Sequence, residues 1–271
     1  MFSEDIKHCQ QKKKSVLVSI GGDQYQGPGW EKPEQAAQQA QKVWDKYGGG
    51  KKGASAFNGV PTNGFDLDIE KNAKNLEAFV RKLWELKKGA KDFYLTAAPQ
   101  CVKDMKSPMS DKDLHQVINK NSHWFDALFV QFYNNKECGL SAAYKRSEGP
   151  ASRRTLQTRN LNLLSWLGLG GGNGPQPTGK PTPTGAPAAT PSASGAGGNG
   201  AGPKIFFGTP GSPQGVSKPH MGYAKPQQIL DAIKPAKKSP NFGGVSVWTV
   251  THALDNKEDP GFLGKIKDGL K

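Results

Sequence analysis

Short apolar runs alternate with longer amphipathic segments along most of this chain, and that alternation limits its possible folds more than any other feature. The apolar runs predict buried strands at 16–20, 65–69, 93–97, 127–132, 204–207 and 245–248. The amphipathic segments predict helices at 33–47, 72–88, 111–124, 155–167 and 226–233. Strands that alternate with helices indicate an α/β fold with a parallel sheet covered by helices. An open doubly wound sheet and a closed barrel both satisfy this pattern.

One segment, 168–203, interrupts the alternation. Its 36 residues include 12 glycines, 7 prolines and a single charged residue, Lys180. Because more than half of these residues resist helix and sheet, the segment is predicted to be a flexible, low-complexity insertion. The insertion divides one domain into two parts, 1–167 with four of the predicted strands and 204–271 with the last two.

The 271 residues carry a formal net charge of +14, which favours acidic partners such as nucleic acid or anionic polysaccharide. The lysines are nevertheless dispersed, no basic stretch alternates with aromatic residues, and no zinc-finger spacing occurs. We therefore expect a solvated basic surface and no nucleic-acid partner. No apolar run reaches the ~18 residues of a membrane-spanning helix. The first residues also lack the basic start and apolar core of a signal peptide.

The strand at 65–69 carries acidic side chains on one face. Successive strand residues point to opposite faces, so Asp66, Asp68 and Glu70 share one side of the sheet. The other side carries apolar residues that can pack beneath helices, namely Phe65, Leu67 and Ile69. Neighbouring carboxylates repel one another when they are desolvated, unless shared protons relieve the repulsion. Such a row therefore needs a chemical reason.

Acid catalysis supplies that reason. Crowded carboxylates raise one another's proton affinity, so one of them can stay protonated near neutral pH and donate its proton. Glu70 is the last of the row, at the carboxyl end of the strand, where barrel enzymes place their chemistry. A solvated edge strand or a cation site is the alternative. The histidines are scattered and none alternates with the carboxylates, so we predict no metal site and no cofactor.

Five segments, in order, resemble the class III, plant- and fungal-type branch of glycoside hydrolase family 18, the chitinases. The stretch 63–70 resembles the family signature Asp-x-x-Asp-x-Asp-x-Glu, with Asn63 in place of the first aspartate. The other segments are VLVSIGG at 16–22, YLTAAPQC at 94–101, FDALFVQFYNN at 125–135 and GGVSVW at 243–248. The resemblance covers nearly the whole chain outside the insertion, and it implies a (β/α)8 TIM-barrel fold.

The resemblance also implies a chitinase that cleaves β-1,4-N-acetylglucosamine linkages with retention of configuration. The substrate's own acetamido group would be the nucleophile. Glu70 would donate a proton and later act as the base. Asp68 would hold the acetamido group, with Asp66 as its buried partner, and Tyr133 would contact the acetamido oxygen.

Two further side chains would bind the sugar by the same resemblance. Gln131 shares a strand face with Tyr133 and would line the sugar site, and Trp248 would stack against the sugar ring. A disulfide is implied between Cys101 and Cys138, at the ends of adjacent strands, whereas the partner of Cys9 would lie upstream of this sequence. A disulfide places the parent protein in an oxidising compartment, here extracellular or in a cell wall.

In the family the strand at 16–20 corresponds to the third of eight barrel strands, so six strands are expected and two are absent. A βα unit takes ~30 residues, so ~60 residues of a full barrel would be missing. We therefore expect an incomplete barrel, truncated at its N-terminus, whose first and last strands are open edges. Asn63 is expected to alter pH dependence more than activity.

Three functions stay open. The first is an endo-acting chitinase, favoured by the retained Asp66, Asp68, Glu70 and Tyr133. The second is a non-catalytic chitin- or glycan-binding relative, or an inactive truncated product, favoured by the incomplete barrel. The third is a basic carbohydrate- or nucleic-acid-binding protein, which salt-sensitive binding to DNA would reveal. The oligomeric state is unknown from the sequence.

Overall fold

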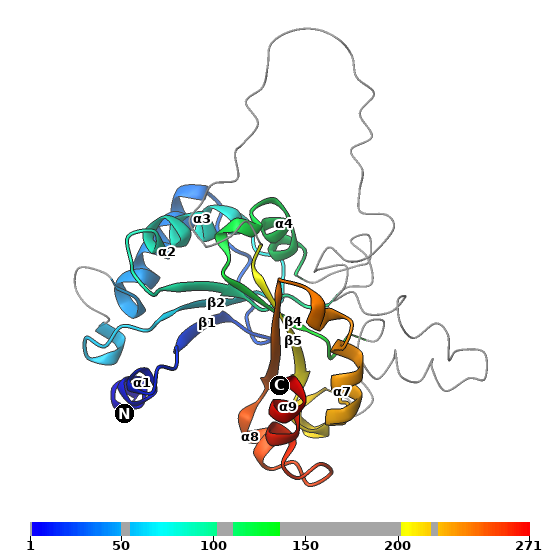
Figure 1. Ribbon diagram of the computed structural model, residues 1–271. Coiled ribbons are helices and arrows are strands. Elements are labelled where there is room, and N and C mark those ends of the chain that lie inside the picture. Colours follow the sequence, from blue (N-terminus) through cyan, green and yellow to red (C-terminus); the bar gives the residue numbers. More distant parts are fainter. Residues whose placement is uncertain (1, 50–54, 102–110, 136–201, 218–221) are drawn as a thin grey trace, which may run out of the picture.

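The computed structural model describes residues 2–49, 55–101, 111–135, 202–217 and 222–271, whose strands form one six-stranded parallel sheet (Figure 1). The strands are β1 (Leu17–Gly21), β2 (Gly64–Asp68), β3 (Tyr94–Ala97), β4 (Ala127–Gln131), β5 (Lys204–Pro210) and β6 (Phe242–Trp248). Each strand pairs in parallel with the next one along the chain. All six predicted strands are confirmed. Their order is that of a barrel wall, because a doubly wound sheet reverses its strand order at one point.

The α-helices are α1 (Phe2–Gln11), α2 (Pro33–Tyr47), α3 (Leu76–Lys87), α4 (Lys112–Lys120), α7 (Pro226–Ile233), α8 (Val250–Leu254) and α9 (Phe262–Leu270). Short 3₁₀ turns are η1 (Ser55–Phe57), η2 (Ser122–Trp124), η3 (Pro213–Gly215) and η4 (Ala236–Lys238). Helices α2 and α7 have the predicted bounds, and each begins with a proline, whose missing N–H is not needed in the first turn. The predicted helix at 72–88 begins later, because Asn75 adopts a left-handed conformation with φ 57°.

Three helices are absent from the sequence prediction. In α1 only Ser3 and Ile6 are buried, so no apolar stripe marks the helix. Helix α8 has only five residues, too few for a periodic pattern. In α9 the buried pair Phe262 and Ile266 is spaced four residues apart, which is one turn and too short a signal to separate a helix from a loop.

The core lies between the sheet and its helices. Figure 1 shows α2, α3 and α4 along one side of the sheet, and α7 with α9 beside β5 and β6. Phe65 and Leu67 of β2 have no exposed surface and belong to the same apolar cluster as Phe79 and Val80 of α3. This confirms the predicted apolar face of β2. The carboxylates that alternate with these residues therefore lie on the opposite face of the sheet.

The edge strands β1 and β6 are covered less than the strands between them. Strands β2 and β4 are mostly buried, whereas β6 is half-buried along most of its length and ends at Trp248, which is 53% exposed. Six strands in barrel order agree with the predicted strand count. The helix predicted at 155–167, the domain boundary at 167 and nearly all of the insertion at 168–203 lie outside the described residues.

Candidate active site

Asp66 lies in a row of polar residues that crosses three strands. The register of β1, β2 and β3 places Ser19, Asp66 and Thr96 side by side. The Ser19 Oγ donates to Asp66 Oδ2 at 3.0 Å, and the Thr96 Oγ1 donates to Oδ1 at 2.6 Å. Burial raises the pKa of Asp66 above its ordinary value, and the two hydroxyl hydrogen bonds oppose that rise. Both neighbouring strands therefore fix the orientation of this carboxyl group.

Asp68 and Glu70 share one hydrogen-bond donor, the side-chain amide of Gln131 at the end of β4. The Gln131 Nε2 lies 2.8 Å from Asp68 Oδ1 and 3.3 Å from Glu70 Oε1. It also donates to the backbone oxygen of Ala98 at 2.9 Å. Because a backbone carbonyl can only accept, this last contact orients the amide with its nitrogen toward the carboxylates. Two N–H groups serve three acceptors, and the contact with Glu70 is the longest.

Tyr133 follows β4 and is 8% exposed. Burial raises the pKa of its hydroxyl, and the negative charges of the three carboxylates raise that pKa further, so the phenol keeps its proton. Gly222 packs against the backbone of Tyr133. Its φ is +125°, and a Cβ at this position would lie 2.5 Å from the Tyr133 Cα. A glycine is therefore required here for the tyrosine to sit close to the carboxylates.

The glycine turn that follows β1 supports the backbone of Asp68. The Gly22 N–H donates to the Asp68 backbone oxygen at 2.7 Å. Gly21 has a φ of +116°, and a Cβ there would lie only 2.2 Å from the same oxygen. Gly21 thus allows β1 to approach the carboxylate strand closely at the point where Asp68 and Glu70 begin to project, and Gly22 adds a backbone hydrogen bond there.

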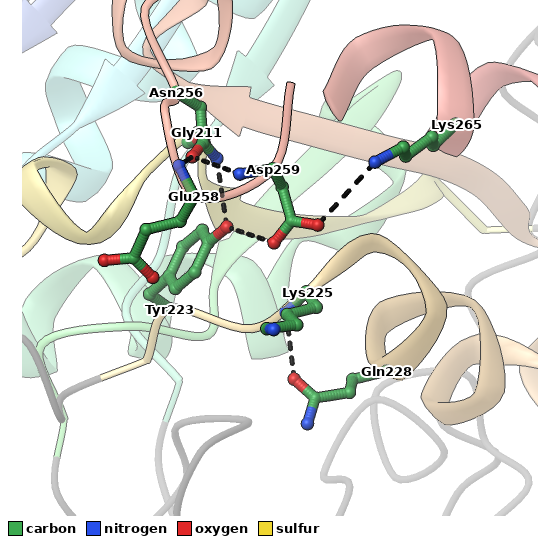
Figure 2. Close-up of polar contacts among 8 residues, drawn as sticks. All are labelled: Gly211, Tyr223, Lys225, Gln228, Asn256, Glu258, Asp259 and Lys265. Atoms are coloured by element: carbon green, nitrogen blue, oxygen red, sulfur yellow. Dashed lines mark hydrogen bonds and ion pairs between the residues drawn. The ribbon is translucent and has the colours of Figure 1, made fainter. Parts of the chain in front are cut away.

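A buried amide ties together the loops that follow β5 and β6 (Figure 2). Asn256 is 3% exposed, and its Nδ2 donates to the Gly211 backbone oxygen at 2.8 Å and to the Tyr223 hydroxyl at 2.9 Å. The Tyr223 hydroxyl in turn donates to Asp259 Oδ2 at 3.0 Å. Burial raises the pKa of Tyr223 to about 12. Since Tyr223 directly follows Gly222, this network also fixes the segment that packs against Tyr133.

The other residues singled out by the sequence are Trp248 and the three cysteines. Trp248 ends β6 at the same carboxyl-terminal edge of the parallel sheet, four strands away from β2, with its indole half exposed. Cys101 is buried, but Cys138 lies outside the described residues, so their disulfide stays a prediction. Cys9 is a free cysteine.

Asn63, which replaces the first aspartate of the family signature, has a structural contact. Its Oδ1 accepts hydrogen bonds from the Val16 N–H and from the Gln10 Nε2, both at 3.0 Å. These bonds join α1 and the start of β1 to β2 at the end of the strand opposite to Glu70. Only an acceptor oxygen is used, and an amide supplies one as well as a carboxylate does.

Two further classes of site are absent from the described ranges. No group of three or more histidine, cysteine, aspartate or glutamate side chains there could hold a metal ion. No helix in the same part of the chain is long and apolar enough to cross a membrane.

Ser19, Thr96 and Gly222 belong to the site although the sequence analysis did not single them out. The first two lie within the predicted strands 16–20 and 93–97. Their place beside Asp66 follows from the observed register of β1, β2 and β3. Aligning the predicted strands by their carboxyl ends would have set both hydroxyls level with Asp68 instead. Gly222 lies in a loop and carries no comparable signal.

The carboxyl of Asp68 should make stability depend on pH. Burial, followed by the charges of Glu70 and Asp66, raises its pKa from 3.8 to about 7. A raised folded-state pKa stabilises the fold below pH 3.8, and that contribution is lost as pH rises through about 7. We expect the melting temperature of Asp68→Asn to rise relative to wild type between about pH 4 and about pH 8.

The exposed Asp268→Asn, on α9, is the control for that titration. The rise in melting temperature relative to wild type over this pH range should be larger for Asp68→Asn than for Asp268→Asn. A difference for Asp68→Asn that stays constant over this pH range would contradict the raised pKa.

Comparison with known proteins places the chain in a family. The family model "Glycosyl hydrolases family 18" matches residues 3–183. A class III chitinase from Arthroderma benhamiae is 32% identical over 276 residues, covering 99% of this chain and 69% of that relative. Endochitinase 33 from Trichoderma harzianum is 28% identical and covers 98% of this chain and 70% of the relative. The chain spans only 45% of chitinase 1 from Candida albicans, at 27% identity.

Solved structures share this fold. The xylanase and α-amylase inhibitor protein XAIP-II from Scadoxus multiflorus superposes with a TM-score of 0.67 at 25% identity, over 98% of this chain and 78% of that one. The ICChI chitinase from Ipomoea carnea gives 0.65 at 23% identity with the same coverage. The carboxylate row, the matching family model and the 32% identical relative together show that this chain belongs to glycosyl hydrolase family 18.

Proposed function

We propose that the protein is a chitinase-type glycoside hydrolase that cleaves β-1,4-N-acetylglucosamine linkages with retention of configuration. The observation that carries this proposal is the row Asp66, Asp68 and Glu70, with the Gln131 amide bonded to the last two. An amide that fixes two carboxyl groups at the carboxyl edge of a parallel sheet is suited to acid–base chemistry.

In the proposed reaction Glu70 transfers its proton to the glycosidic oxygen. The acetamido oxygen of the sugar on the non-reducing side attacks the anomeric carbon of that sugar, and the bond to the leaving oxygen breaks. The resulting oxazolinium ion carries a positive charge, which Asp68 stabilises in its ionised form. Water then attacks the anomeric carbon, the bond from that carbon to the acetamido oxygen breaks, and the acetamido group is restored. The proton of the water passes to the Glu70 carboxylate, which restores the acid.

The surrounding residues have supporting roles in this proposal. Tyr133 keeps its phenol proton at neutral pH and is therefore a hydrogen-bond donor for the acetamido oxygen. Gln131 donates to both Asp68 and Glu70 and thereby orients the two carboxyl groups. The half-exposed indole of Trp248 offers a flat apolar surface on which a sugar ring can stack.

We also propose that Cys101 and Cys138 form a disulfide and that the parent protein acts outside the cell or in a cell wall. Cys101 is buried at the end of β3, directly beside the backbone of Gln131. Peptide mapping of the protein without reduction should yield one cross-linked peptide that contains both cysteines. Recovery of Cys138 in its free form would contradict the pairing.

The test of the proposed function is hydrolysis of an N-acetylglucosamine tetramer, followed by proton NMR. We expect the β-anomer of the product to appear first and the α-anomer to grow in only by mutarotation, because two inversions retain configuration. The fully deacetylated tetramer is the matched control. It lacks the acetamido nucleophile and should not be cleaved, and its cleavage at an equal rate would overturn the substrate-assisted mechanism.

A non-catalytic glycan-binding protein is the second candidate. The half-buried edge strands favour it, and so does the similarity to a solved protein described as an inhibitor of xylanase and α-amylase. This candidate predicts binding of the acetylated tetramer, measured by calorimetry, without release of any shorter product.

A further inference from the structure

The chain beyond β3 is paired on one side with the end of β4. The Gln131 N–H donates to the Pro99 oxygen at 2.9 Å, and the Cys101 N–H donates to the Gln131 oxygen at 3.1 Å. Gln100 thus forms a parallel bridge with Gln131. In this pairing pattern the N–H and C=O of Gln100 itself point away from β4. On that other side the register of β2 with β3 ends at Leu67 and Ala97.

Two side chains of α4 and its N-cap contact the Gln100 backbone where the β2 pairing has ended. The Oδ2 of Asp111 accepts from the Gln100 N–H at 2.9 Å. The Nε2 of His115 lies 3.0 Å from the Gln100 oxygen and 3.2 Å from Asp111 Oδ2. Because both of these oxygens are acceptors, the Nε2 carries a hydrogen. Together the carboxylate and the imidazole bond the N–H and the C=O of Gln100, as a neighbouring strand would.

Both side chains are buried, with 1% of Asp111 and none of His115 exposed. Burying a carboxylate and an imidazole costs free energy unless hydrogen bonds satisfy them, and an apolar pair would cover α4 at less cost. Asp111 and His115 contact Gln100, and the two neighbours of Gln100 in the chain pair with the backbone of Gln131. Gln131 carries the side-chain amide shared by Asp68 and Glu70. The backbone oxygen of Ala98, two residues before Gln100, orients this amide.

We propose that Asp111 and His115 are positioning residues for the reaction at Glu70. They act as a substitute strand that holds segment 98–101 and, through it, the amide of Gln131. This inference rests on the proposed function. Neither side chain needs to touch the substrate.

The first test compares two replacements of His115. Methionine has a similar length but no donor, whereas the Nε2 of glutamine can again donate to the Gln100 oxygen. We expect His115→Met to lower kcat on the acetylated tetramer by on the order of 10- to 100-fold, with a smaller change in KM, because the amide orients groups that act in the transition state. His115→Gln should recover most of that loss.

Val117→Ala, on the same helix, controls for general destabilisation. Val117 is 3% exposed, and its truncation removes apolar packing from α4. Melting temperatures of all variants are measured first, so that rates are compared at equal folded fractions. If Val117→Ala lowers kcat as much as His115→Met does, or if glutamine recovers nothing, the positioning role is wrong.

A double-mutant cycle with Gln131→Ala tests the route of the effect. If His115 acts through the amide, His115→Met should add little to the loss already caused by Gln131→Ala. Fully additive losses would show that His115 acts elsewhere and would overturn the inference.

A carbon-13 NMR titration of the Asp68 carboxyl needs no turnover. The hydrogen bond from Gln131 lowers the pKa of Asp68, so both His115→Met and Gln131→Ala should raise its titration midpoint, and Val117→Ala should not. If the wild type cleaves nothing but the midpoint rises, the proposed function fails, whereas the inference that His115 holds the Gln131 amide stands. An unmoved midpoint in His115→Met overturns the positioning role whatever the activity.

Discussion

Replacing Glu70 with glutamine should lower kcat on the acetylated tetramer by about 10³-fold, because a positioned general acid contributes on the order of 10²- to 10⁴-fold. The amide preserves the size of the side chain but has no proton to give to the glycosidic oxygen. The loss should be smaller for an aryl glycoside such as a 4-methylumbelliferyl oligomer, since a phenolate leaves with less help from an acid. Steady-state kinetics on the two substrates measure both effects.

Glu31→Gln is the matched control, since Glu31 is exposed and pairs only with the exposed Lys74 among the contacts described. Its kcat should equal that of wild type. Equal losses on the natural and the aryl substrate in Glu70→Gln would contradict the acid role, because leaving-group ability would then not matter.

Replacing Gly21 with alanine should destabilise the fold by about 2–6 kcal/mol. A non-glycine residue at positive φ costs about 1–3 kcal/mol. The added Cβ would also meet the Asp68 backbone oxygen at 2.2 Å, so the two strands must move apart, which costs a further ~1–3 kcal/mol. Urea denaturation measures the loss, and kcat of the folded fraction should fall as well because Asp68 moves with its backbone.

Gly22→Ala separates the two causes. Gly22 also has a positive φ, +91°, but a Cβ there would meet nothing within 4 Å. Only the conformational cost of about 1–3 kcal/mol remains, and activity per folded molecule should be kept. Equal destabilisation by the two alanine substitutions would show that close approach to Asp68 is not what the first glycine provides.

The sequence predicted the strands well because each is a short apolar run bounded by polar residues, and the alternation at 65–70 gave the two faces of β2 correctly. The same alternation singled out Asp66, Asp68 and Glu70, and the family resemblance added Gln131. The roles of Ser19 and Thr96 depend on strand register, which no single strand reveals. The role of Gly222 depends on a contact between two loops, and α1 has too few buried residues to leave a pattern.

The alternation within β2 couples correct folding to the assembly of the active site. A slip that turned this strand over by one residue would place Asp66, Asp68 and Glu70 against the helices and move Phe65, Leu67 and Ile69 to the opposite face of the sheet. Ionised carboxylates under α3 would cost far more than the marginal stability of a domain. Misaligned chains should therefore fail to fold at all, and every folded molecule in a preparation should contain an assembled carboxylate row.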